Sequence, residues 1–462
     1  MNTIRAMILC LMTVSLGLAQ DVQDLAARAE GGDSRAQLAL GKAYLNGTGL
    51  EKNCALGKEW ITKAAEQGLL EAMKELADIC CYGRCSDHQD WPTALAWYEK
   101  AAACGDGYSA FKCGEAFYYG RAAQRDYSKA MSYFKQSAEA GYAQGFTMLG
   151  QMQAHGEGVE KNLAEAVKYY RLAALSDESW GQYYLGYDYD FGEGVPQSYP
   201  EAMKWYLLAA NQCNSWAMNN IGIMYERGRG VKQDSKKAFE WYGKSAAYDN
   251  AWAECNLGIS YYWGRGVKKD FAKAIYWFGK SAEGGNLDAL QTLASIYLEG
   301  RGARIDLEKA RDFNDRYLEK LPDNIYGLCR QAVINFRSGD REGALARLAE
   351  LAGQCAGQAD KLGTIGWAYF QCGHFPEAMD LTAASLSVKE LDWVYYNLGY
   401  YHLLKGDIEK AKQVYQQGMK KFGACRDAVK DLFEAVQEGR QAEAARAILK
   451  KIFHYKGSIG TP

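Results

Sequence analysis

Cysteines and a histidine around residue 85 are the side chains in this sequence that could bind a metal ion or form a disulfide bond. Cys80, Cys81, Cys85 and His88 follow one another closely, and thiolates and imidazoles are the ligands that Zn²⁺ prefers in proteins. The spacing of Cys81, Cys85 and His88 could supply metal ligands, but it lacks the regular ligand pairs of structural zinc sites. The same thiols could form a disulfide bond, with Cys54 as a candidate partner. We favour a disulfide and expect no bound metal and no cofactor.

The remaining cysteines agree with disulfide chemistry. Of 13 cysteines, Cys10 lies in an apolar N-terminal segment, and the even number of 12 remains in the rest of the chain. Cys329 and Cys355 are expected at adjacent ends of one helix pair, which makes them a second candidate pair. The connectivity stays open, because the number of ways to pair so many thiols is very large.

Familiar catalytic arrangements are missing from the sequence. None of the five histidines lies in a His-Glu-x-x-His zinc motif, and no Gly-x-Ser-x-Gly nucleophile elbow accompanies them. A Gly-x-Gly-Val turn recurs along the chain, but no strand precedes it, so it is not a phosphate-binding loop. We therefore expect a protein that is not an enzyme.

Residues 1–19 have the layout of a secretory signal peptide. Arg5 is the only charge among the first 20 residues, and an apolar stretch runs from Ala6 to Ala19. Gly17 and Ala19 are small residues at the −3 and −1 positions of a cleavage site before Gln20. The stretch is too short and interrupted to span a bilayer comfortably, and no later run is apolar enough. We expect an exported, soluble chain that is periplasmic or secreted, where disulfides persist.

The overall charge excludes one class of partner. Lys and Arg number 54 and Asp and Glu number 56, so no global basic field would attract nucleic acid. Apolar residues make up 48% of the chain, which is typical of folded rather than disordered proteins. The 49 glycines beside only six prolines indicate helices that are joined by glycine turns.

The glycines recur at a fixed period, and the chain is therefore a repeat array. A small residue, which we call the marker, recurs every 36 residues with one spacing of 37: Gly41, Ala77, Gly114, Gly150, Gly186, Gly222, Gly258 and Ala294. Six places after each marker stands a glycine: Gly47, Gly83, Gly120, Gly156, Gly192, Gly228, Gly264 and Gly300. Nineteen or twenty places after each marker stands an aromatic residue: Trp60, Trp97, Tyr133, Tyr169, Trp205, Trp241, Trp277 and Phe313. An internal repeat of this length is typical of a solenoid.

Each repeat is predicted to contain two helices around a glycine turn. Residues 252–262 predict a first helix that ends at Gly264, because glycine readily adopts the positive φ of a helix terminus. Apolar residues spaced three and four apart after residue 270 predict a second helix with one buried face. The marker lies inside the first helix and allows its partner to approach, and we expect the aromatic column to fill the space between them. The predicted fold is an all-α, right-handed α-solenoid of about twelve helix pairs.

The repeat resembles a known family. Residues 217–249 contain the pattern Ile221-Gly222, Tyr225, Gly228-Arg229-Gly230-Val231, Lys237-Ala238, Trp241-Tyr242 and Ala246-Ala247. This pattern is similar to the Sel-1-like repeat, a relative of the tetratricopeptide repeat. The resemblance assigns eight such repeats to residues 20–321. Residues 322–421 look like tetratricopeptide repeats with spacings of 34 and 33, Pro322 marks the junction, and residues 422–462 are expected to form a C-terminal helical cap and tail.

Three tryptophans are the first candidates for a binding surface. Trp180, Trp216 and Trp252 stand six places before successive markers, where a first helix begins, while Gln144 interrupts the series. They could form an exposed aromatic strip for a peptide or a sugar chain, since tryptophan is frequent in binding hot spots. Alternatively, each tryptophan packs on the preceding second helix.

The resemblance adds further candidates. A tyrosine column is expected to serve packing, as the family consensus has tyrosine there: Tyr44, Tyr189, Tyr225, Tyr261 and Tyr297. In related folds the first helices line the concave face that binds partners, which would place in the groove Tyr187, Asn219, Asn220, Asn256, Tyr262 and Asn397. Asparagine can both donate to and accept from an extended peptide backbone.

A basic ridge is a further candidate surface. Equivalent loops carry Arg227, Arg229, Lys232, Arg265, Lys268, Lys269, Arg301 and Arg304. The ridge could meet an acidic partner or a polysaccharide, or it could be a solvated edge whose charge nearby acidic residues offset.

The resemblance implies that the chain is an exported scaffold or adaptor for a protein or peptide partner, bound at the concave face of the solenoid. Three alternatives stay open. One is an envelope protein that binds polysaccharide or peptidoglycan fragments. Another is an adaptor of endoplasmic reticulum degradation, although no retention tetrapeptide or C-terminal membrane helix is present. The last is a β-lactamase-like enzyme, for which no Ser-x-x-Lys nucleophile stands in the expected context.

Overall fold

A computed structural model describes residues 21–85, 88–422, 432 and 442–451. The described residues form helices and their connections, with no β-strand among them. The chain divides into two compact units, residues 1–248 and 249–462. The predicted signal peptide, including Cys10, lies outside the described residues, as does most of the predicted C-terminal cap.

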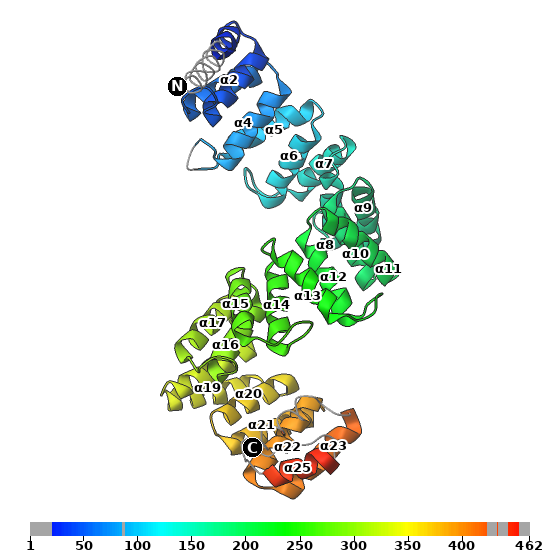
Figure 1. The fold of residues 1–462 in the computed structure, drawn as a ribbon, viewed down its shortest axis with the longest axis vertical. Coiled ribbons are helices and arrows are strands. Elements are labelled where there is room, and N and C mark those ends of the chain that lie inside the picture. Colours follow the sequence, from blue (N-terminus) through cyan, green and yellow to red (C-terminus); the bar gives the residue numbers. More distant parts are fainter. Residues whose placement is uncertain (1–20, 86–87, 423–431, 433–441, 452–462) are drawn as a thin grey trace, which may run out of the picture. The chain divides into compact units, whose positions relative to one another are not determined.

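In unit 1, residues 21–30 are helical, and helices of nearly equal length follow: α2 (Ser34–Asn46), α3 (Cys54–Glu66), α4 (Leu70–Tyr82), α5 (Trp91–Ala103), α6 (Gly107–Tyr119), α7 (Tyr127–Glu139), α8 (Gln144–His155), α9 (Leu163–Leu175), α10 (Ser179–Phe191), α11 (Tyr199–Asn211), α12 (Ser215–Arg227) and α13 (Ser235–Ala246) (Figure 1). Even numbers are the first helices of the repeats and odd numbers are the second helices.

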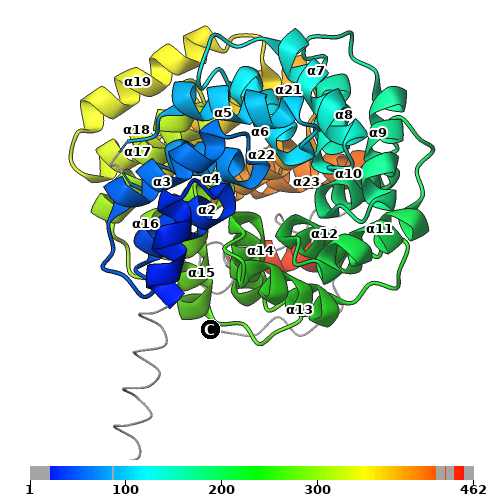
Figure 2. The same ribbon diagram turned by 90° about the horizontal axis from the view of Figure 1, so that it is seen from above.

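Unit 2 continues the alternation with α14 (Ala251–Trp263), α15 (Phe271–Glu283), α16 (Leu287–Glu299), α17 (Leu307–Lys320), α18 (Ile325–Arg337), α19 (Arg341–Gln354), α20 (Ala359–Gln371), α21 (Phe375–Val388), α22 (Asp392–Lys405), α23 (Ile408–Phe422) and α25 (Ala442–Lys451). Consecutive helices pack in pairs, and first helices of adjacent pairs contact one another, as α8 and α10 do in unit 1 (Figure 2). In unit 2, α18 and α20 make the same kind of contact. The predicted all-α solenoid of helix-turn-helix repeats is confirmed.

The helix ends follow from local sequence. First helices of the Gly-x-Gly repeats end at a glycine in the left-handed region, such as Gly228 with a φ of 68°. Second helices mostly begin at an Asp or Asn whose side chain accepts a backbone N–H, as Asp234 does from Lys236 and Lys237. Each repeat therefore encodes its own turn and its own helix start, independently of its neighbours.

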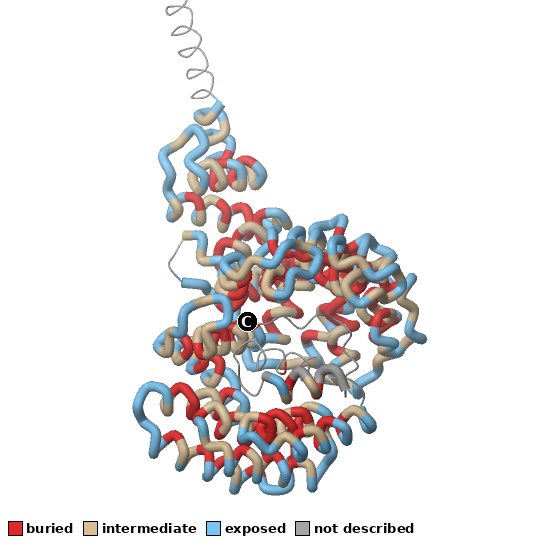
Figure 3. The backbone as a smooth tube through the Cα atoms, turned by 60° about the horizontal axis from the view of Figure 1, so that its bottom comes forward, coloured by how far each residue is buried: buried red, intermediate tan, exposed pale blue. Residues whose placement is uncertain are grey.

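The marker positions are close contacts between the two helices of a repeat. A Cβ added to Gly222 would lie 2.5 Å from Cε1 of Tyr242, and the equivalent atom on Gly258 would lie 2.6 Å from Cδ1 of Phe278. Tyr242 and Phe278 are at most 4% exposed. The ring of the second helix therefore occupies the volume that a side chain at the marker would need. Buried residues follow the inner sides of the helices in both units (Figure 3).

This contact corrects the prediction about the aromatic column. The residues that fill the space beside the marker stand one place later: Ile61, Tyr98, Phe134, Tyr170, Tyr206, Tyr242 and Phe278. The predicted column is only half-buried, because adjacent residues on a helix point about 100° apart. Several of its rings stack instead with a lysine three residues on, as in Trp97 with Lys100 at 3.8 Å and Trp241 with Lys244 at 4.0 Å.

The change of repeat period at Pro322 lies inside unit 2, where packing continues across it. Asn314 Nδ2 on α17 donates to the carbonyl oxygen of Gly327 on α18 at 3.1 Å. One hydrophobic core extends from Leu298 and Ala310 through Ile325 to Tyr415. Within this unit, the two predicted repeat blocks therefore share a core.

The marker contact predicts opposite effects for two Gly→Ala changes in one repeat. Gly222→Ala should lower the free energy of unfolding by about 1–3 kcal/mol, because the added methyl overlaps a buried ring. The matched control, Gly243→Ala on α13, should raise it by up to about 1 kcal/mol, because that position is exposed with no atom within 4 Å and alanine favours helix. Thermal and urea unfolding followed by circular dichroism measure both. Equal effects of the two changes would contradict this account of the marker.

Candidate binding surface on the first helices

A hollow of about 390 Å³ lies on the first helices α6, α8 and α10 of unit 1. The face of α8 that lines it carries Gln144, Thr147, Met148 and Gln151, which are spaced three and four apart as one helical face requires. Aromatic residues line it from the neighbouring helices: Phe111 and Tyr119 from α6, and Trp180 and Tyr184 from α10. The volume lies within the range of ligand pockets.

The residue that interrupts the tryptophan series lies in the lining of this hollow. Gln144 occupies the position on α8 at which α10 carries Trp180. The smaller amide leaves space that an indole would occupy, while Trp180 remains at the edge with 41% of its surface exposed. The hollow therefore lies where one repeat departs from its neighbours in sequence.

The aromatic side of the hollow is held rigidly. The ring of Trp180 lies 5.8 Å from that of Tyr183 and 6.1 Å from that of Tyr184. Tyr184 stacks in turn on Tyr170 of α9 at 5.0 Å, and Tyr170 is 3% exposed. Contacts of this kind contribute beyond the area that they bury, so Trp180 and Tyr184 are packed against other rings of unit 1.

The polar groups of the hollow are largely bonded to one another. Glu178 accepts from Thr147 Oγ1 at 2.6 Å and from the backbone N–H groups of Trp180 and Gly181 at 3.1 and 2.6 Å. Gln151 Nε2 donates to the hydroxyl of Tyr184 at 2.5 Å. Since the only charged residue in the lining is this bonded carboxylate, the hollow presents apolar rings and neutral amides to a ligand.

The two other tryptophans of the series are also at the surface. Trp216 on α12 is 38% exposed, and Trp252 on α14 in unit 2 is 48% exposed. More than half of each side chain is therefore covered, so both tryptophans also contribute to packing. Trp180 belongs to the lining of the hollow on α6, α8 and α10, and Trp216 and Trp252 do not.

The groove candidates of unit 1 lie at different depths. Tyr187 is half-buried, and its ring lies 4.5 Å from that of Phe191. Asn220 is also half-buried and donates to the hydroxyl of buried Tyr206 at 3.0 Å. Asn219 is only 4% exposed, so its amide lies in the interior of α12 rather than on a surface that a partner could reach.

In unit 2, Asn256 and Asn397 are half-buried on α14 and α22. Tyr262 lines a second cavity, of about 400 Å³, between α14 and α16. Trp263 and Gln291 line the same cavity.

The predicted basic ridge is partly neutralised. Arg229 Nη1 lies 3.3 Å from Asp190 Oδ1 within unit 1. In unit 2, Arg301 Nε lies 2.8 Å from Glu299 Oε2. Acidic neighbours therefore offset at least these two of its charges, as the alternative interpretation of the ridge anticipated.

The sequence analysis did not predict a second set of exposed aromatic residues. It ends several first helices, immediately before the turn glycine, and its members are 47–51% exposed: Tyr82, Tyr119 and Phe191 in unit 1, and Trp263 in unit 2. Tyr119 belongs to the hollow described above. The signal was available, since aromatic residues precede four of the eight aligned glycines.

The cysteine cluster separates into two environments. The thiol of Cys81 is buried in a core of unit 1, whereas the thiol of Cys85 lies beside Cys54 of the preceding repeat. Burial, followed by contact with Cys54, raises the pKa of Cys85 to about 12. Among the described residues, no group of three His, Cys, Asp or Glu side chains could hold a metal ion.

The second candidate pair, Cys329 and Cys355, is buried in one core of unit 2. The described cysteines are all free thiols, so the disulfides remain predictions.

A buried carboxyl group lies on α10, the helix that carries Trp180. Asp188 is 7% exposed, and its Oδ2 atom has no hydrogen-bond partner among the described residues. Burial, reinforced by the nearby charge of Glu193, raises the pKa of Asp188 to about 8. The side chain is therefore mostly protonated at neutral pH.

Comparison with known families identifies the repeats. The family model described as Sel1 repeat matches residues 34–69, 70–106, 107–142, 147–177, 181–212, 217–247, 253–286, 288–313 and 394–420. The chain belongs to the Sel1 repeat family. The ninth Sel1 match lies in the segment that the sequence predicts as tetratricopeptide-like. Sel1 repeat solenoids are typically non-catalytic scaffolds suited to protein–protein interaction.

Solved structures agree with this family. A protective antigen of uropathogenic Escherichia coli with an SLR fold is 24% identical, with a TM-score of 0.61, and the match covers 96% of this chain and 99% of that one. A Sel1 repeat protein from Oxalobacter formigenes is 31% identical, with a TM-score of 0.50 over 54% of this chain and 99% of that one. No curated protein matches the chain significantly. Among the described residues of this Sel1 repeat protein, no helix has the length and apolarity that a bilayer crossing requires.

The raised pKa of Asp188 predicts a pH-dependent effect of Asp188→Asn. Below the ordinary pKa of 3.8, Asp188 is protonated in both the folded and the unfolded state, and its contribution to the stability of the fold is fully present. As pH rises towards about 8, the unfolded state loses this proton more readily than the folded state, so that contribution is lost. Wild-type stability should therefore fall between pH 4 and pH 8 by a few kcal/mol relative to the Asn variant. Urea unfolding across this range measures the difference. The control, exposed Asp24→Asn, should follow the wild type, and parallel curves for all three proteins would contradict the prediction.

Proposed function

We propose that this Sel1 repeat protein is an exported scaffold that binds a protein partner through the first-helix surface of unit 1. The observation that carries the proposal is the hollow on α6, α8 and α10, with Trp180 and Tyr119 exposed at its edge. Large aromatic residues that are rigid yet exposed are typical anchors of protein interfaces.

The geometry favours a partner that inserts an apolar side chain. The rings are already fixed by contacts within α9 and α10, so binding costs little side-chain entropy. The neutral amide of Gln144 beside them can pair with a peptide group of the ligand. We propose no catalytic role for this surface, because its one carboxylate is already bonded to Thr147 and backbone N–H groups.

A sugar chain is the second candidate ligand. Flat aromatic faces beside neutral amides suit the apolar and hydroxyl faces of a sugar ring, and both are present at the hollow. A glycan array with the wild-type protein separates this possibility from peptide binding.

Export is proposed on two grounds. Residues 1–19 have the layout of a signal peptide. Cys54 and Cys85 are in contact across adjacent repeats, an arrangement that an oxidising compartment can convert to a disulfide. In that step, both thiols lose their protons and two electrons to a disulfide oxidant, which leaves as two thiols.

The proposed surface predicts loss of the partner from an aromatic variant. Residues 20–462 serve as bait for extracts of the native host, beside the Trp180→Ala, Trp216→Ala, Trp252→Ala triple variant. The specific partner should be captured at least about tenfold less by the variant, because a hot-spot tryptophan contributes about 2 kcal/mol or more. Tyr276→Ala is the matched control, since Tyr276 is a 57% exposed aromatic residue on a second helix. Equal capture by all three proteins would place the binding surface elsewhere.

Export predicts two covalent features in protein isolated from its native host. The mature chain should begin at Gln20, and peptides that contain Cys54 and Cys85 should be linked until a reductant is added. Peptide mapping by mass spectrometry identifies the N-terminal residue. The same measurement with and without a reductant detects the linked peptides. An intact Met1 with free Cys54 and Cys85 would contradict export.

A further inference from the structure

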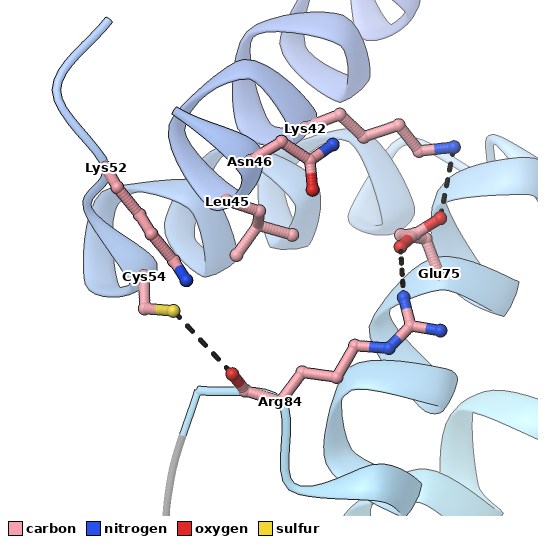
Figure 4. Close-up of a pocket in the computed structure, with 7 residues that line it drawn as sticks. All are labelled: Lys42, Leu45, Asn46, Lys52, Cys54, Glu75 and Arg84. Atoms are coloured by element: carbon pink, nitrogen blue, oxygen red, sulfur yellow. Dashed lines mark hydrogen bonds and ion pairs between the residues drawn. The ribbon is translucent and has the colours of Figure 1, made fainter. Parts of the chain in front are cut away.

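A second pocket in unit 1 carries three cations in its lining, together with Leu45, Asn46, Cys54 and Glu75. It has a volume of about 380 Å³ and lies between the first two repeats, with Lys42 and Asn46 from α2, Lys52 from the following loop, Glu75 from α4 and Arg84 from the loop after α4 (Figure 4). Three positive charges therefore face one negative charge.

The single carboxylate orders the cations without neutralising them. Glu75 is held by Lys42 Nζ at 3.0 Å and by Arg84 Nη1 at 3.2 Å, one on each of its oxygens. The side chain of Glu75 is 20% exposed, while those of Lys42 and Arg84 are 44% and 52% exposed. Both cations keep N–H donors that Glu75 does not use.

Lys52 supplies the uncompensated charge. Its side chain extends toward the same space from the opposite side (Figure 4), and no carboxylate of the described residues lies within ion-pair distance of it. The amide of exposed Asn46 adds a neutral donor, and Leu45 adds an apolar contact. Anionic ligands are recognised by this combination of convergent charged and neutral donors.

We propose that this pocket binds a carboxylate side chain of an acidic segment in the protein partner. The lining combines a net positive charge with one apolar side chain, which together suit a carboxylate carried on a short aliphatic chain. Leu45 can contact the methylene groups that carry such a carboxylate. The inference rests on the proposed function for the nature of the partner, but it involves a different surface from the aromatic hollow.

Binding of a labelled acidic peptide to the full chain tests the pocket directly. Fluorescence anisotropy compares a glutamate-rich peptide with the same peptide carrying glutamine in place of glutamate. The wild type should prefer the acidic peptide, and Lys52→Gln should weaken its binding about tenfold, as loss of one charge-assisted hydrogen bond implies. Lys52→Arg should retain binding, because the charge is kept.

The matched control is Lys135→Gln, which removes the same charge from an exposed position on α7. Equal weakening by Lys52→Gln and Lys135→Gln would overturn the proposal, because it would indicate unspecific attraction. So would equal binding of the two peptides, or displacement of the acidic peptide by inorganic phosphate at least as readily as by succinate.

The triple tryptophan variant separates this inference from the proposed function. If the acidic peptide binds that variant normally, the pocket acts independently of the aromatic surface. If the peptide fails to bind the wild type while the tryptophans still govern partner capture, the pocket proposal fails and the proposed function stands.

Discussion

The contact on which the rest of the structure depends is a buried side chain of the second helix lying against the backbone of the first. Gly222 and Tyr242 show it most clearly, since no Cβ could be placed between them. The missing side chain allows the two helices to approach, and the ring then excludes water from both. Because this contact recurs in six repeats, each of those helix pairs contributes a similar layer to the cores that run along the two units.

This local construction leaves most of each first helix free to vary. The turn glycine and the capping Asp or Asn define where helices end, and the marker contact defines how they pair. No marker and no turn glycine belongs to the lining of the hollow on α6, α8 and α10, although Glu178, which caps the start of α10, does. The binding surface can therefore be built from residues on which helix pairing does not depend, such as Gln144 and Trp180.

Much of the fold could be predicted from sequence because its determinants are local and repeated. The helix pairs, the glycine turns and the membership of Trp180 in an exposed surface all follow from aligned positions. The buried column was placed one residue too early, since Trp241 and Tyr242 are both aromatic and the pattern does not say which faces inward. The hollow was not predicted, because its lining comes from three neighbouring helices, α6, α8 and α10. A regular spacing within one helix does not show how side chains from three helices fit together. Asn219 was predicted to face the groove but is buried, because the helices packed around α12 decide how deep this position lies.

The position occupied by Gln144 also bears on how such a protein can change. A residue at the start of a first helix is not part of the marker contact, so replacing it changes the shape of the surface more than the pairing of the two helices. Partner recognition and helix pairing therefore depend largely on different residue positions of the same repeat. A solenoid of this kind can acquire a new specificity by exchanging one repeat, or even one residue, without the risk of unfolding that accompanies changes inside a single shared core.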